Sequence, residues 1–116
     1  MSLLWVVLLG GCGPSFEQDV EPILYARCVG CHQGEGAEAG LDLGAGPYAA
    51  LMDAESTQSD MMLIEPGSSL YSYAFHKVNG TQGIAGGAGT TMPLGNPLSD
   101  EELTAIADWI DAGARP

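Results

Sequence analysis

The chain has 116 residues, the length of one domain, and its 17 glycines and 7% aromatic residues leave little side-chain volume for a core. We therefore expect a bound group to fill part of the interior. Fifteen acidic residues against three basic ones give a net charge of −12. This charge excludes binding to nucleic acid or to an anionic membrane surface through electrostatics, and it favours partners with a basic surface.

The chain opens with a short apolar run from Leu3 to Leu9, which ends in the letters LGGC at Cys12. Seven apolar residues cannot span a bilayer as a helix, because about 20 are needed, but they suffice for the hydrophobic region of a signal peptide. The LGGC ending resembles a bacterial lipobox, in which the cysteine is lipidated and becomes the mature N-terminus. We predict a leader over residues 1–11, a lipid on Cys12 and one domain over residues 12–116. A plain signal peptide and an apolar tail are the alternatives.

A first helix is predicted to run into the letters RC at residues 27–28. Ser15 or Asp19 can cap its start, and Pro22 is tolerated only in a first turn. Four apolar residues fall on one face of this helix: Phe16, Val20, Ile23 and Leu24.

The middle of the chain alternates glycine-rich segments with short helices. Residues 33–46 are rich in glycine and acidic groups, with GLDLG as a short extended piece, and Pro47 can open a helix through YAALM. A third helix is predicted to begin near Ser68 and to end at Asn79. The segment that follows is too rich in glycine to be helical.

The last helix has the clearest signals. Ser99 and Glu102 fit a capping box, Leu98 and Leu103 a hydrophobic staple, and Gly113 a stop. The predicted buried stripe comprises Leu103, Ile106, Ala107 and Ile110, with Trp109 on its margin. No strand pattern or repeat is apparent, so the predicted fold is small and all-α, with its two terminal helices available to pack together.

Cys28, Cys31 and His32 form a C-x-x-C-H motif at the end of the first predicted helix. Two cysteines at this spacing can reach the two vinyl groups of haem, and the histidine that follows can point its imidazole at the iron. A zinc site usually needs four ligands, whereas the chain has one other histidine, His76, and no second cysteine pair. A thioredoxin-like redox pair would need a βαβ context. The motif therefore favours covalently bound haem c, and with a lipid on Cys12 it accounts for all three cysteines.

From about Ser15 to Ala114 the chain resembles a class I c-type cytochrome, most closely the small cytochrome c domains of planctomycete-type and related bacterial proteins. The matching segments are DVEPIL before RCVGCH, then GLDLG, IEPGSSL, TMPLG and LSDEELTAIADWIDAGA. The resemblance implies the small all-α cytochrome c fold around one haem c, bound through Cys28 and Cys31. It also implies His32 as the proximal and Met92 as the distal iron ligand, and electron transfer rather than turnover of a substrate.

The residues around Met92 agree with a ligand carried on a loop. Five glycines between positions 80 and 89 allow the chain to fold over the open haem face, and Pro93 biases Met92 toward an extended backbone. The main competitor is His76, which on a continuous helix shares a largely polar face with serines and a tyrosine and is therefore predicted to be exposed. An open or water-bound sixth position is the remaining alternative.

One departure from the better-known cytochromes concerns the segment after the motif. Mitochondrial-type members carry a proline whose carbonyl holds the proximal imidazole, but HQGEGAEAGLDLG contains none. The acceptor for the second ring nitrogen of His32 is therefore undetermined from the sequence, although haem-ligating histidines normally have one.

The functional prediction is a one-haem electron-transfer protein of the bacterial cell envelope, not an enzyme, whose iron cycles between ferric and ferrous. With Gly13 after Cys12, the sorting rule for lipoproteins implies the outer membrane, with membrane contact by the lipid anchor only. Redox proteins with a basic docking surface are the expected partners. The alternatives are a haem-based sensor or peroxidase-like domain with an open sixth position, and a metal-clipped structural domain. No acid–base or nucleophile–base pair supports separate enzymology.

Overall fold

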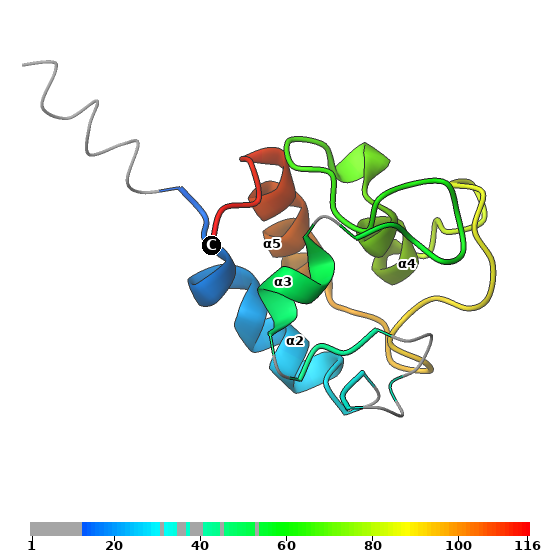
Figure 1. Ribbon diagram of the computed structural model, residues 1–116, viewed down its shortest axis with the longest axis horizontal. Helices are drawn as coiled ribbons and strands as arrows, with labels where there is room; N and C mark the ends of the chain where they lie inside the picture. Colours follow the sequence, from blue (N-terminus) through cyan, green and yellow to red (C-terminus); the bar gives the residue numbers. More distant parts are fainter. Residues whose placement is uncertain (1–12, 31, 35–36, 38–40, 45, 53) are drawn as a thin grey trace, which may run out of the picture.

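The computed structural model describes residues 13–30, 32–34, 37, 41–44, 46–52 and 54–116 (Figure 1). The predicted leader and two of the predicted site residues, Cys12 and Cys31, lie outside the described residues. The elements are the π-helical turn η1 (Phe16–Val20), helices α2 (Glu21–Arg27) and α3 (Pro47–Leu51), the 3-10 turn η3 (Ser69–Tyr71), and helices α4 (Tyr73–Asn79) and α5 (Asp100–Asp111). The all-α prediction is confirmed: within the described residues the only strand-like pairings are isolated bridges at Met62.

The two ends of the domain pack against each other, as predicted. The elements η1 and α2 form one continuous helical segment, and η1 lies against α5 (Figure 1). The ring of Phe16 packs 5.2 Å from that of Tyr48 on α3 and 5.4 Å from that of Trp109 on α5, measured between centroids. These three rings form the centre of the core, because each brings a large apolar area from a different helix.

The start of the first helix is capped by two reciprocal hydrogen bonds. The Ser15 hydroxyl accepts from the backbone N–H of Gln18, and the Asp19 carboxylate accepts from the backbone N–H of Ser15 at 2.8 Å. Ser15 is therefore the N-cap, and Asp19, the other predicted cap, lies inside η1 and supports Ser15 through its carboxylate. Pro22 lies in the first turn of α2, where the π-helical turn η1 gives way to the α-helix.

Helix α5 begins with the predicted capping box between Ser99 and Glu102. The prediction for Trp109 was wrong, since this side chain is not marginal but 1% exposed. The tail after Gly113 folds back over the helix, and the indole N–H donates to the Arg115 carbonyl at 2.8 Å. A helical-face argument could not include this contact, because the tail lies beyond the helix.

The third predicted helix is split in two by Ser72. This residue has φ −107° and ψ 111°, outside the helical region, and it is fully buried. Its hydroxyl accepts from the backbone N–H of Glu65 and donates to the Ser68 carbonyl, both at 2.8 Å. A serine that bonds main-chain groups in this way competes with helical hydrogen bonding, which explains the break.

Candidate haem site

The haem motif begins where α2 ends. The backbone N–H groups of Cys28 and Val29 both donate to the Leu24 carbonyl, and that of His32 donates to the Cys28 carbonyl at 3.1 Å. These bonds turn the chain tightly through the motif and place His32 one turn after Cys28. The Cys28 side chain is half-buried, and burial raises the pKa of its thiol, while Arg27 opposes the shift. Cys31, between them, lies outside the described residues.

The imidazole of His32 is held by the GLDLG segment. Its Nδ1 lies 3.2 Å from the Leu41 carbonyl oxygen, and the His32 carbonyl accepts from the backbone N–H of Leu43 at 2.7 Å. A carbonyl oxygen can only accept, so Nδ1 donates to it, and in a neutral imidazole this places the lone pair on Nε2. The Leu41 carbonyl thus provides the acceptor that the sequence left undetermined. A neutral histidine fixed in this tautomer fits an iron ligand.

Arg27, directly before the motif, joins three segments. Its Nη1 lies 2.6 Å from the Glu102 carboxylate on α5, and its Nη2 donates to the carbonyls of Asn96 and Pro97 at 2.6 and 3.0 Å. The segment that follows Met92 is thereby fastened to the end of α2. Sequence reasoning missed this arginine, because its partners lie 69 to 75 positions away and leave no local signal.

Glu102 takes part both in this ion pair and in the capping box of α5. The hydrogen bond from the Ser99 backbone is the largest effect on the pKa of the Glu102 carboxyl and lowers it. Burial, the next largest effect, raises this pKa, and the charge and hydrogen bond of Arg27 lower it further. The carboxylate therefore couples the start of α5 to the haem motif.

Met92 is half-buried and lies beside α4. Its backbone N–H donates to the Lys77 carbonyl at 2.9 Å, so the loop that leaves α4 at Gly80 returns to the same helix twelve residues later. Gly80 has φ 80°, the left-handed conformation that glycine adopts at a helix end without strain.

The predicted exposure of His76 was wrong. Its side chain is buried, with Nε2 2.6 Å from the Leu70 carbonyl oxygen and Nδ1 2.6 Å from the Thr81 hydroxyl. The carbonyl requires Nε2 to donate, so Nδ1 accepts from the hydroxyl and both nitrogens are used within the protein. The face assigned from a continuous helix does not apply, because the break at Ser72 turns α4 relative to the preceding residues.

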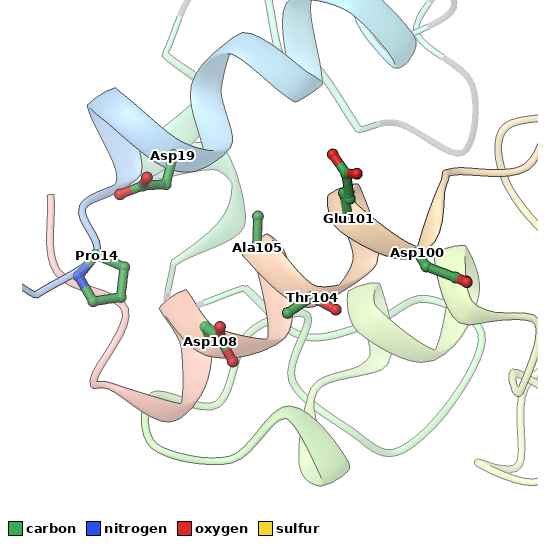
Figure 2. Close-up of a pocket in the computed structure, with 7 residues that line it drawn as sticks. All are labelled: Pro14, Asp19, Asp100, Glu101, Thr104, Ala105 and Asp108. Atoms are coloured by element: carbon green, nitrogen blue, oxygen red, sulfur yellow. The ribbon is translucent and has the colours of Figure 1, made fainter.

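A groove between the amino-terminal segment and α5 has four acidic residues in its lining (Figure 2). It is lined by Pro14, Asp19, Asp100, Glu101, Thr104, Ala105 and Asp108. None of these is a predicted haem residue. The chain's three basic residues are engaged elsewhere: Arg27 as above, Lys77 on the Ala88 carbonyl and Arg115 on the Gly13 carbonyl. None of these three basic side chains lines the acidic groove.

The all-α fold and the C-x-x-C-H motif at the end of α2 are typical of a c-type haem protein. The family model for cytochrome c matches residues 22–113, and the chain belongs to the cytochrome c family. It is accordingly a haem-binding electron-transfer protein whose cofactor is covalent haem c with its iron, as the resemblance implied.

Among solved structures, the chain is similar to Kuenenia stuttgartiensis hydrazine synthase, with a TM-score of 0.59 and 20% sequence identity. The match covers 87% of this chain but 16% of that one, so the chain spans a small part of that protein's length. At this identity the likeness supports the fold alone. No curated protein matches the sequence.

The ion pair gives a prediction for stability in acid. Because folding lowers the pKa of Glu102 from 4.5, the stability that it contributes is present above pH 4.5 and is lost as pH falls through the folded pKa. Urea unfolding from pH 6 down to about pH 3 should show a shallower acid loss in Glu102→Gln than in wild type. Glu101→Gln makes the same change of charge at the neighbouring exposed position and should keep the wild-type slope. Parallel curves for Glu102→Gln and wild type would contradict the assignment.

Proposed function

We propose that the protein is a one-haem electron carrier of the bacterial cell envelope, with His32 and Met92 as axial ligands and thioether bonds to Cys28 and Cys31. The observation that carries this proposal is the contact between His32 Nδ1 and the Leu41 carbonyl, because it leaves Nε2 as a ligand. The chain transfers electrons and does not itself turn over a substrate.

Each proposed residue has a distinct physical role. Haem c, when bound, supplies a one-electron ferric–ferrous couple. The Cys28 thiol stands at the end of α2, where it can form a thioether that fixes the cofactor to a helix. The hydrogen bond to Leu41 fixes the orientation of the His32 ring. The Met92 thioether is a soft, neutral donor, which favours the ferrous state and fills the sixth position.

The main alternative is a haem-based sensor or peroxidase-like domain with an open sixth position. His76 is not a good candidate to fill that position in place of Met92, because both of its ring nitrogens are already hydrogen-bonded. A second alternative is a module of a larger enzyme, for which the similarity to a short part of hydrazine synthase is the support. Electron transfer within such an assembly would use the same ligand set.

The attachment through two cysteines is tested on denatured protein. After maturation with haem-attachment machinery, the wild type should keep its haem-linked peroxidase stain on a denaturing gel. The double variant Cys28→Ala, Cys31→Ala should lose the stain, because no thioether can form. Cys12→Ser, which removes the third cysteine, is the matched control and should keep it. A stain that persists in the double variant would refute the attachment.

The distal ligand is tested by optical spectra and by carbon monoxide. The ferric wild type should show the weak red charge-transfer band of iron–thioether bonding, and the ferrous form should not bind carbon monoxide. Met92→Ala should lose the band, bind carbon monoxide and have a lower reduction potential. Met61→Ala, at another half-buried methionine, is the matched control and should keep the wild-type spectrum.

His76 provides the discriminating variant for the same measurement. His76→Gln should lower the free energy of unfolding, because a buried and doubly hydrogen-bonded side chain is replaced, but it should retain the band. Loss of the band in His76→Gln and not in Met92→Ala would make His76 the ligand. Ready binding of carbon monoxide by the wild type would favour the sensor or peroxidase function over the electron carrier.

We also propose how the domain meets its surroundings. Cytochrome c domains are usually extracytoplasmic and pass electrons to redox partners. Within the described residues no helix could cross a membrane. The LGGC segment supports a lipid on Cys12 and outer-membrane anchoring, and the acidic groove along α5 supports a partner with a basic surface.

The lipid anchor and the docking of a basic partner should respond differently to ionic strength. Membranes from the native host, washed at high ionic strength, should retain the wild type, and detergent should release it, because several acyl chains do not depend on charge. Cys12→Ser should appear in the wash. The same salt should slow electron exchange with a basic redox protein, because screening weakens the attraction. Release of wild type by salt alone would contradict the lipid anchor, and salt-independent exchange would contradict the basic partner.

A further inference from the structure

Lys77 on α4 binds the segment that carries Met92 through its main-chain carbonyl and through its side-chain ammonium. The Lys77 carbonyl accepts the backbone N–H of Met92 at 2.9 Å, and the Lys77 ammonium donates to the Ala88 carbonyl at 2.7 Å. The segment from Ala88 to Met92 is therefore bound to Lys77 at both of its ends. Gly89 lies so close to this ammonium that a Cβ there would come within 2.9 Å of its nitrogen.

Gln82 closes the loop from the other side. Its side-chain amide nitrogen donates to the Gly89 carbonyl at 3.2 Å and lies 3.5 Å from the Thr91 hydroxyl. The main-chain carbonyl of Gln82 accepts from the backbone N–H of Gly87 at 2.8 Å. The side chain is 8% exposed, and its amide oxygen has no hydrogen-bond partner among the described residues. Burial of an amide with an unpaired oxygen is unfavourable, so apolar packing alone does not explain a glutamine at this position.

The loop also passes too close to α4 to shift toward it. Gly87 lies directly against the Tyr73 ring, so that a Cβ there would overlap the phenol, and the Tyr73 hydroxyl is fixed by a 2.9 Å hydrogen bond to Gln58. Tyr73 itself is 3% exposed. The glycines that make this segment flexible in isolation therefore serve here as points of close approach.

We propose that Lys77 and Gln82 are positioning residues that hold the Met92 loop in its iron-binding shape. This inference rests on the proposed function, in which Met92 is the distal ligand. A methionine on an unrestrained glycine-rich loop would lose much conformational entropy on binding and would leave the iron often. The clamp formed by the two side chains restrains the loop before Met92 binds, which lowers that cost and lengthens the lifetime of the bond between methionine and iron.

The lifetime of that bond can be measured with imidazole as the probe. Exogenous imidazole binds ferric haem only after Met92 has left, so at saturating imidazole the observed rate equals the rate at which Met92 dissociates. Lys77→Leu and Gln82→Leu should each raise this limiting rate by about three- to tenfold, the factor expected for one lost hydrogen bond. The hydrogen exchange of the Met92 amide, which is bonded to Lys77, should accelerate in both variants.

The matched control is Tyr48→Phe. It removes one hydrogen bond of the same kind, from a side chain to a main-chain carbonyl, but at Ala114 rather than in the loop. Its limiting rate should stay within about twofold of wild type, even if urea shows that it is as destabilised as the clamp variants. Rates in Lys77→Leu and Gln82→Leu equal to that of Tyr48→Phe would overturn the clamp. If one of the two clamp variants does not fold, the imidazole rate and the Met92 amide exchange of the other variant still test the clamp.

The result for Met92 separates this inference from the function on which it rests. If Met92→Ala binds imidazole at a much higher rate than wild type while the clamp variants do not, the ligand assignment stands and the clamp is wrong. If Met92→Ala and wild type bind imidazole at the same rate, Met92 is not the ligand and the proposed function itself fails.

Discussion

The guanidinium of Arg27 is the contact on which the arrangement of the site depends. It belongs to the residue directly before the haem motif, and it binds the first turn of α5 and the chain just beyond Met92 at the same time. Only arginine offers several donors in a rigid planar fork, so one side chain can satisfy a carboxylate and two carbonyls together. In a domain with few aromatic residues and many glycines, this side chain connects segments that lie 69 to 75 positions apart in the sequence.

Main-chain carbonyls hold both proposed ligands. The His32 ring is oriented by the carbonyl of Leu41, and the backbone of Met92 is held by the carbonyl of Lys77. Neither ligand lies within a helix or strand, so the precision that regular structure would provide comes from hydrogen bonds across loops. This arrangement explains how a glycine-rich chain can present two residues to a metal, since each loop is fixed at the point where its ligand projects.

The helices could be predicted from the sequence where the signal is local. The burial of a side chain could not be predicted where it depends on a segment outside the helix. The capping box of Ser99 and Glu102, the proline at the start of α3 and the C-x-x-C-H motif are short patterns, and they give the all-α fold and the cofactor. Trp109 and His76 were assigned to the wrong environments, because the tail and the break at Ser72 alter which faces are inside. The Leu41 carbonyl could not be foreseen, because any residue offers a carbonyl and only the course of the loop selects one.

The charge of the protein connects its stability with its proposed docking. All three basic side chains are used to hold the chain together, at Glu102, at the Ala88 carbonyl and at the Gly13 carbonyl. The acidic residues along α5 and η1 repel one another, which opposes folding, and the same charge would attract the basic partner that we propose. Salt therefore acts in opposite directions on the two properties, since screening relieves the repulsion within the domain and weakens the attraction between the domain and its partner. A chain with more lysines would fold with less repulsion, but the long-range attraction that we propose for a basic partner would be weaker.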